Sequence, residues 1–343
     1  MSLTHTAYIS RRIIKYGSIG IVSLLLFWTL GKGAYKIYRT IYPPYSPPTV
    51  KYGNLPRIIF PEKEKVKKSF TFEFPNDETP EFKDQNKVYI IYRPNNSFLA
   101  LEKDKETAEK FGFSNDPIEI KSGIYEFKNE LGRNLRTNVL DGSFKMTYPY
   151  LEDQMLNDPT KMPNKNEAIK VASQGLGNGD KLTEDLENGV KEVVFLKIEN
   201  NGLKTVGSQA EANVARIYFY RKELDDLKVV SKDVGQASVS VLISGSEVLE
   251  KKILEINYKD LNIDRESFST YPIKTVDEAI GDLNSGNYWP ASDVVNDKVV
   301  IRRIYLAYFE PVTLTNYLQP VFVFEGDNNF TAYIPAVSNE KTD

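Results

Sequence analysis

An uncharged, apolar run near the N-terminus constrains this chain more than any other feature. Residues 16–31 read YGSIGIVSLLLFWTLG and contain no charged side chain. As an α-helix this run would span about 24 Å at 1.5 Å per residue, slightly less than a hydrocarbon core of roughly 30 Å. Apolar residues on both sides lengthen it, so we predict one transmembrane helix over residues 13–38.

The flanks of this run suit a membrane interface, where basic and aromatic side chains concentrate. The predicted interface residues are Arg11, Arg12, Lys15, Trp28, Lys32 and Tyr35. A cleaved signal peptide is an alternative, but residues 31–34 read GKGA, and a lysine suits a cleavage site poorly. A buried core helix is the other alternative.

The orientation follows from a weaker argument, because the basic residues on the two flanks nearly balance. Residues 1–12 form a short tail without a recognisable cytoplasmic module. We therefore expect a single-pass protein of the cell membrane with a cytoplasmic N-terminus and an extracytoplasmic C-terminal body.

The charge of the chain is unevenly distributed. Residues 1–61 contain eight Lys and Arg and no acidic residue, whereas residues 62–343 contain 36 basic and 47 acidic residues, a net charge of −11. A protein that binds duplex nucleic acid needs a basic face to neutralise phosphates. We expect the lipid bilayer as a partner and no nucleic acid.

Two missing residue types exclude several kinds of site. The chain has no cysteine, and its single histidine is His5. Disulfides, zinc–thiolate sites and cysteine nucleophiles are therefore excluded, and the body cannot hold a Ser-His-Asp triad or a site with several histidines. We expect no metal, no cofactor and no catalytic residue.

Six prolines follow the predicted helix, within residues 42–62. Proline favours extended polyproline II backbone, which acts as a semi-rigid spacer. We predict a tether over residues 39–62 that holds the body away from the bilayer. The PYSP sequence at residues 44–47 also matches a ligand of SH3-like domains, which is the alternative.

The remaining residues predict an α+β fold: a β-rich body with antiparallel sheets and short helices. Strands are indicated by the alternation of Phe70, Phe72 and Phe74 with polar residues and by the run 87–92. A helix is indicated at residues 103–111. The predicted divisions are the tail (1–12), the transmembrane helix (13–38), the tether (39–62), an N-terminal α+β domain (63–160), two repeats (161–264 and 265–337) and a C-terminal tail (338–343).

The two repeats share an order of elements. The first begins at Asn166 with NEAI and is followed by strand-like residues 193–199 and 215–220. The second begins at Asp277 with DEAI and is followed by strand-like residues 299–307 and 319–324. A chance likeness between two α+β segments is the alternative.

The second repeat reads TVDEAIGDLNSG, then KVVIRRIYLAYFEP, then NYLQPVFVFEGDNNFTAYIPAV. Over residues 274–337 it resembles PepSY-like repeats and the extracytoplasmic domains of YycH/YycI-like regulatory proteins of bacteria. The resemblance implies an N-terminal anchor, an outer body of helix and sheet, and control of a membrane sensor kinase through protein–protein contacts. It implies no catalytic residues.

Several polar clusters have an ordinary structural explanation. The glycine-rich residues 175–180 lack the Lys-Ser/Thr of a phosphate-binding loop, so we expect a helix end and a loop. Residues 225–226 and 327–329 lack the spaced acids of a calcium loop, so we expect turns. The sequons at residues 95–97 and 329–331 matter only in a eukaryotic secretory pathway.

One aromatic group is the candidate partner-binding surface: Tyr288, Trp289, Tyr308 and Tyr317. Such residues anchor protein partners or stack on sugars, and core packing is the alternative. We interpret the chain as a non-enzymatic membrane-anchored protein that regulates or scaffolds a membrane or envelope partner. A structural subunit of a surface assembly and a carboxylate-dependent envelope hydrolase are the alternatives.

Overall fold

A computed structural model describes residues 3–41, 45–63, 68–75, 78–92, 98–156, 162–199, 202–293 and 296–343. The chain forms two compact units, Met1–Pro48 and Thr49–Asp343, the second of which we call the body. The predicted fold class is confirmed: a long apolar helix precedes a β-rich body with two mostly antiparallel sheets and short helices.

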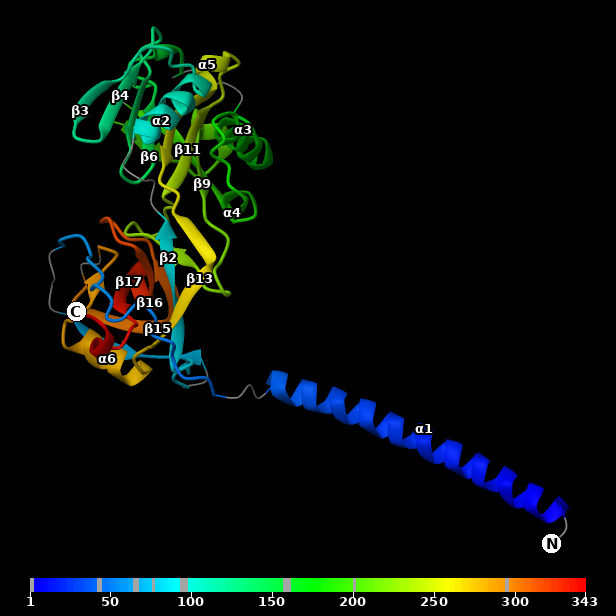
Figure 1. Ribbon diagram of the computed structural model, residues 1–343. Coiled ribbons are helices and arrows are strands. Elements are labelled where there is room, and N and C mark those ends of the chain that lie inside the picture. The colour runs from blue at the N-terminus through cyan, green and yellow to red at the C-terminus, as the bar shows by residue number, and fades with distance from the viewer. Residues whose placement is uncertain are drawn as a thin grey trace. The chain divides into compact units, whose positions relative to one another are not determined.

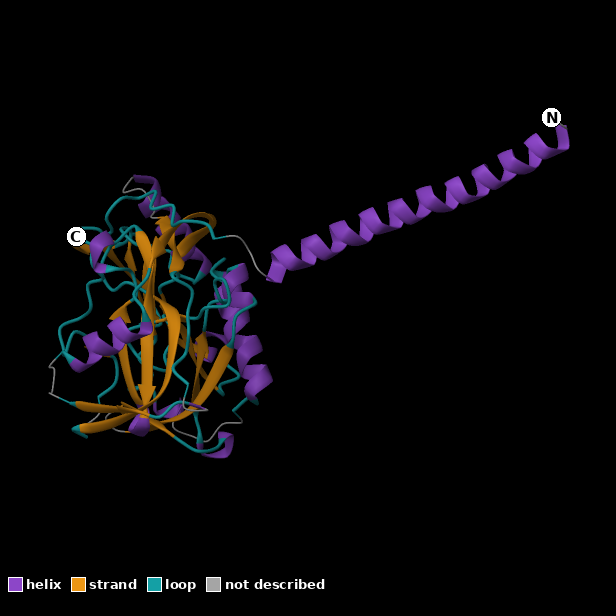
Figure 2. Cartoon of the chain, turned by 90° about the horizontal axis from the view of Figure 1, so that it is seen from below, coloured by secondary structure: helices purple, strands orange, loops and turns teal. Residues whose placement is uncertain are grey.

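The first unit is dominated by one uninterrupted helix, α1 (Leu3–Ile41), shown in Figure 2. Its 39 residues give a length of about 58 Å, well beyond the thickness of a hydrocarbon core. The predicted transmembrane segment 13–38 lies inside α1, and residues 3–12 of the predicted tail are helical as well. Among the described residues, Tyr8–Ile41 is the one stretch long and apolar enough to cross a membrane, a test that a signal sequence also passes.

The first sheet of the body has nine strands, which are antiparallel throughout. In spatial order they are β3 (Ile118–Lys121), β4 (Ile124–Lys128), β5 (Asn134–Asn138), β6 (Ser143–Thr147), β12 (Ile253–Tyr258), β11 (Val239–Ser244), β9 (Val214–Phe219), β7 (Lys191–Glu199) and β8 (Gly202–Thr205). In Figure 1 these strands lie beside the helices α2 (Phe98–Lys110), α3 (Lys165–Asn178), α4 (Glu184–Glu187) and α5 (Leu249–Lys252).

Helix α3 builds the main core of this sheet. It begins with a capping box in which Asn164 and Glu167 each accept from the other's backbone N–H, so the first turn has its donors satisfied. One face of α3 then presents Ala168, Ala172 and Leu176, which are fully buried. These side chains pack in one cluster with strand residues such as Ile217.

The second sheet has eight strands. Five strands follow one another in the order β1 (Ser69–Phe72), β15 (Lys298–Phe309), β16 (Tyr317–Gly326), β17 (Phe330–Pro335) and β14 (Trp289–Pro290). Strand β10 (Val229–Val230) also pairs with β15. Strand β2 (Gln85–Tyr92) pairs with both β16 and β13 (Asn262–Pro272). The pairs that β15 makes with β1 and β10 are parallel, and the others are antiparallel.

Helix α6 (Val276–Asn284) covers one face of the second sheet. A capping box between Thr275 and Glu278 starts it, as in α3. Its Ala279 and Leu283 are fully buried against a cluster that includes Phe322 and Phe324 of β16. Both helices of the expected repeats therefore start alike and precede antiparallel strands, although they pack on different sheets.

The chain passes between the two sheets four times. It leaves the second sheet after β2, returns for β10, leaves again for β11 and returns after β12. The nine-stranded sheet consequently takes strands from both sides of the expected boundary at residues 160 and 161. That connector lies largely outside the described residues, and the linear domain divisions stay predictions.

Candidate functional site

The four aromatic residues of the expected partner surface lie in separate places. Tyr288 packs with α6, and Trp289 pairs with Tyr333 across β14 and β17. Tyr308 is fully buried beside Tyr89, and its hydroxyl contacts the Asn86 side chain and the Lys87 carbonyl. Only Tyr317, at the start of β16, is half-buried. Tyr288, Trp289 and Tyr308 are buried in cores, so the four rings form no continuous exposed patch.

Trp289 and Tyr317 nevertheless mark a distinct surface, because both contact the segment that precedes β1. We call this segment, Thr49–Lys63, the strap. It overlaps the predicted tether, yet its residues lie against the second sheet. Tyr52 lies 5.4 Å from the Tyr317 ring and Phe60 lies 5.4 Å from the Trp289 ring, centre to centre. Of the described residues of the predicted tether, only 39–41 and 45–48 lie outside the body.

The first half of the strap is held by backbone hydrogen bonds. Val50 N–H donates to the Thr270 carbonyl at 3.1 Å. Leu55 is fully buried, its N–H donates to the Lys341 carbonyl at 2.8 Å, and its carbonyl accepts from Asp343 at 3.0 Å. This half is therefore tied to an edge strand and to residues 341–343.

The second half, Pro56–Lys63, is held in a different way. Gln319 Nε2 donates to the Pro56 carbonyl, and Trp289 Nε1 donates to the Pro61 carbonyl, both at 2.8 Å. Within the described chain, no backbone–backbone hydrogen bond joins these strap residues to the sheet. Proline lacks an N–H, but its carbonyl accepts normally, so side-chain donors take the place of a ladder.

Open space flanks this half of the strap on several sides. A cleft of about 930 Å³ and another of about 630 Å³ share the lining residues Pro61, Glu62, Lys63 and Trp289. A third cleft, of about 300 Å³, adjoins Pro56–Ile59. We call the two larger clefts, with the strap between them, the Trp289 groove.

Two lysines of the groove are paired with acids. Lys63 lies 2.9 Å from Asp293, and Lys274, whose side chain is only 9% exposed, lies 2.8 Å from Asp282. The donors that face Pro56 and Pro61 are an amide and an indole, which recognise carbonyl oxygens. No group of acids or histidines suited to a metal occurs among the described residues. In this structure the groove contacts the backbone of the strap through these two donors.

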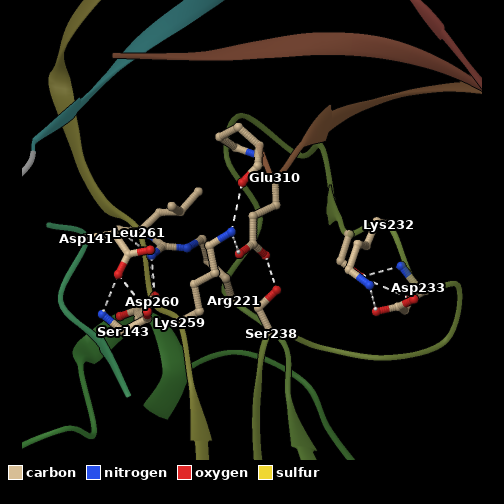
Figure 3. Close-up of polar contacts among 12 residues, drawn as sticks. Asp141, Ser143, Arg221, Lys232, Asp233, Ser238, Lys259, Asp260, Leu261 and Glu310 are labelled. Atoms are coloured by element: carbon tan, nitrogen blue, oxygen red, sulfur yellow. Dashed lines mark hydrogen bonds and ion pairs between the residues drawn. The ribbon is translucent and has the colours of Figure 1, made fainter. Parts of the chain in front are cut away.

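A second cluster, of charged side chains, lies where the chain passes between the sheets (Figure 3). The junction cluster consists of Asp185, Arg221, Ser238, Lys259, Asp260 and Glu310. Arg221 donates to Asp260 and to the carbonyl of Leu261, and it forms an ion pair with Asp185 of α4. Arg221 and Asp260 are each 9% exposed, so two carboxylates compensate one buried guanidinium.

Glu310 belongs to the same cluster but comes from the other sheet. It follows β15, and its Oε2 accepts from the Ser238 hydroxyl, which precedes β11 (Figure 3). Its Oε1 has no hydrogen-bond donor among the described residues, and Lys259 Nζ lies 3.9 Å away. Burial raises the pKa of Glu310, and the nearby Lys259 ammonium and Ser238 hydroxyl oppose this.

The junction cluster is suited to holding the sheets together. Lys259 Nζ also donates to the Pro311 carbonyl at 2.8 Å, so it bridges the sheets a second time. The cavity beside Glu310 measures about 30 Å³, which admits water but no organic substrate. A carboxylate-dependent hydrolase needs two acids facing a substrate, whereas Asp185 and Asp260 here face Arg221.

The predicted interface residues all lie on α1, whose side chains are exposed from Tyr8 onward. Lys32 Nζ lies 3.7 Å from the centre of the Trp28 ring, and the Arg39 guanidinium lies 5.2 Å from the Tyr35 ring. Such pairs place an ammonium or guanidinium beside an aromatic face, as is typical of a membrane boundary. Arg11, Arg12 and Lys15 lie near the other end, where Arg12 is 5.7 Å from the Tyr8 ring.

The polar clusters that we expected to be turns take such conformations. Gly179 ends α3, and Asp180, with φ of 54°, forms an ion pair with Lys110. Asp225 has φ of 48° and accepts from the hydroxyl of Tyr89. Residues 327–329 connect β16 to β17. The sequon at residues 95–97 lies outside the described residues.

Sequence reasoning missed the strap contacts and the junction cluster. The strap gave one weak signal, the apolar run Ile58–Phe60 among the prolines, which a free spacer does not need. The junction cluster gave none, because Arg221 and Glu310 follow strands that are far apart in the sequence. Polar residues just after a strand resemble ordinary loop residues.

Comparison with known proteins finds only distant similarity. No family model matches the chain, and no curated protein matches it. An uncharacterised protein from Eubacterium rectale aligns over 81% of this chain and 92% of its own, with 12% identity and a TM-score of 0.44. The C-terminal domain of YpeB from Bacillus megaterium aligns over 72% and 95%, with 11% identity and a TM-score of 0.30. Neither similarity assigns a family or a function to this chain.

Proposed function

We propose that this protein is a single-pass membrane protein whose extracytoplasmic body regulates or scaffolds a membrane or envelope partner without enzymatic activity. The observation that carries the proposal is α1, in a separate unit, whose span Tyr8–Ile41 contains an 18-residue window with a mean hydropathy of 1.7 and no buried residue. So large an apolar surface is stable in lipid rather than in water. The absence of cysteine and of any histidine beyond His5 supports a non-enzymatic role.

The orientation can be tested directly because the chain has no cysteine. Single variants Ser2→Cys and Glu340→Cys would be labelled in intact cells with a membrane-impermeant maleimide. We expect Glu340→Cys to be labelled and Ser2→Cys to be labelled only after the cells are opened. The opposite pattern would reverse the orientation, and recovery of the protein from the soluble fraction would exclude the anchor.

The partner contact needs a separate test. A photo-crosslinking residue placed at Asp293, in the Trp289 groove, is compared with one at Lys204, an exposed position on the other sheet. The proposal expects a defined membrane or envelope protein to be captured from Asp293 and not from Lys204. A ladder of identical subunits from both positions would favour the structural-subunit alternative.

A further inference from the structure

The strap is seated on the second sheet in the manner of a bound peptide. Ile58 and Phe60 pack against the cluster that contains Trp289, Phe309 and Tyr333, whereas Ile59 is 61% exposed. Alternate side chains pointing in and out are the pattern of an extended segment recognised by pockets. The ring of Phe60 is nearly parallel to the indole, at an interplanar angle of 7°, and lies 4.8 Å from the ring of Phe309.

The donors of the groove recognise proline carbonyls. Trp289 and Gln319 each donate one hydrogen bond, to Pro61 and Pro56 respectively. An aromatic surface with an indole donor is the usual chemistry for reading extended, proline-containing backbone. Since both bonds reach main-chain oxygens, another peptide with the same backbone could accept them equally well.

The way the strap is held allows exchange. Its second half lacks a backbone ladder to the sheet and is flanked by the clefts of about 930 and 630 Å³. Leu55, in contrast, is fully buried and paired with residues 341–343. Pro56–Lys63 can therefore leave the groove while the first half of the strap stays bound.

We infer that the Trp289 groove is a binding site for an extended partner peptide with an aromatic residue followed by proline, and that Pro56–Glu62 is its internal competitor. The inference deepens the proposed partner contact by naming the chemistry of the partner. A covalently attached segment competes at an effective concentration on the order of millimolar, so it masks the site until it is displaced. Only the fraction of molecules with an open groove binds the partner.

The test uses the full-length protein in lipid nanodiscs and a labelled peptide, PRIIFPE, with the sequence of residues 56–62. The variant Phe60→Ala weakens the strap without altering the groove wall. We expect it to bind the peptide roughly tenfold or more tightly than the wild type, as an increase in the open fraction requires. Fluorescence anisotropy measures the dissociation constants.

Two matched variants control the comparison. Ile59→Ala changes the neighbouring, outward side chain and should bind like the wild type. Phe60→Ala combined with Trp289→Phe keeps a ring but removes the indole donor, so it should lose the gain. A control peptide with alanine in place of phenylalanine and both prolines should bind none of the variants. Equal binding by the Phe60→Ala and Ile59→Ala proteins would overturn the inference.

A second measurement does not depend on a weakened strap. A fluorophore on Ile59→Cys reports the mobility of the strap in an otherwise cysteine-free chain. Saturating PRIIFPE should increase that mobility, whereas an unchanged signal at millimolar peptide would contradict exchange. An anchored, correctly oriented protein that fails both peptide tests would leave the proposed anchor standing and remove this site.

Discussion

The junction cluster and the Trp289 groove both hold distant segments together, but by opposite means. At the junction, Arg221 is 9% exposed and faces two carboxylates, so removal of one partner leaves a buried charge. In the groove, Phe60 is held by stacking, and the strap carbonyls accept from two neutral donors. Contacts of the first kind fix an arrangement, whereas contacts of the second kind can be exchanged for similar ones.

The largest effect should come from Arg221→Met, which removes the cation paired with buried Asp260 and leaves Asp185 with Arg265. We expect the free energy of unfolding to fall by roughly 3–5 kcal/mol. Arg302→Met is the matched control, because Arg302 also contacts two acids, Glu73 and Asp327, but at the surface. Chemical denaturation should show Arg302→Met close to the wild type. Similar losses for both variants would show that burial of the Arg221 pairs does not set their contribution to stability.

Gly189→Ala should destabilise the region next to Arg221 through a steric clash, without changing any charge. A Cβ at Gly189 would lie 1.8 Å from the Tyr220 carbonyl oxygen, which is main chain and cannot rotate away. We expect a loss of roughly 1–3 kcal/mol on denaturation, typical of an overpacked site. Gly281→Ala in α6 is the control, since nothing lies within 4 Å of its Cβ, and it should stabilise the protein slightly.

Trp289→Phe tests the groove on the same scale. The variant loses the hydrogen bond to the Pro61 carbonyl but keeps an aromatic ring, so stability should fall by only about 1 kcal/mol. Strap mobility, read from the Ile59→Cys label, should rise clearly, because the Pro61 carbonyl has lost its donor. A large loss of stability without added mobility would make the groove a fixed element like the junction.

The smallest effect should be a pH dependence at Glu310. Burial raises the pKa of Glu310, so as pH falls the folded protein binds a proton at a higher pH than the unfolded chain does. Protonation removes the destabilising cost of a buried carboxylate, so the folded state gains stability as pH falls through the raised pKa. Glu310→Gln should therefore be more stable than the wild type above that pKa, and the difference should shrink towards the ordinary glutamate range. Denaturation midpoints measured from pH 8 to pH 4.5 check this, and a constant difference would contradict it.

Much of the fold followed from local pattern. The DEAI run that opens the second repeat at Asp277 lies in α6, and alternating Phe70 and Phe72 predicted β1. The uncharged run 16–31 predicted the long helix. In each case the residues that carry the pattern are neighbours in the sequence, so propensity and burial point to the same element.

The sites did not follow from local pattern, for a physical reason. Prolines at positions 56 and 61 predicted extended backbone, but an extended segment can be free or docked, and Trp289, 228 positions away, contacts this one. Glu310 and Ser238 likewise meet although they are 72 positions apart. Burial of Tyr308 was equally invisible, because a strand with apolar residues on both faces gives no sign of which surface is covered.

The pairing of Asn54 and Leu55 with residues 341–343 sets an order of events during synthesis. Asn54 donates to Asp343, which lies 289 positions later in the chain. At roughly 5–20 residues per second, a ribosome needs on the order of 15–60 s to make that interval. An apolar helix at the N-terminus can enter a bilayer well within this time. The strap is therefore made early, whereas Trp289 and the other groove residues are made only near the end of that interval, so the competitor is already present when the groove forms.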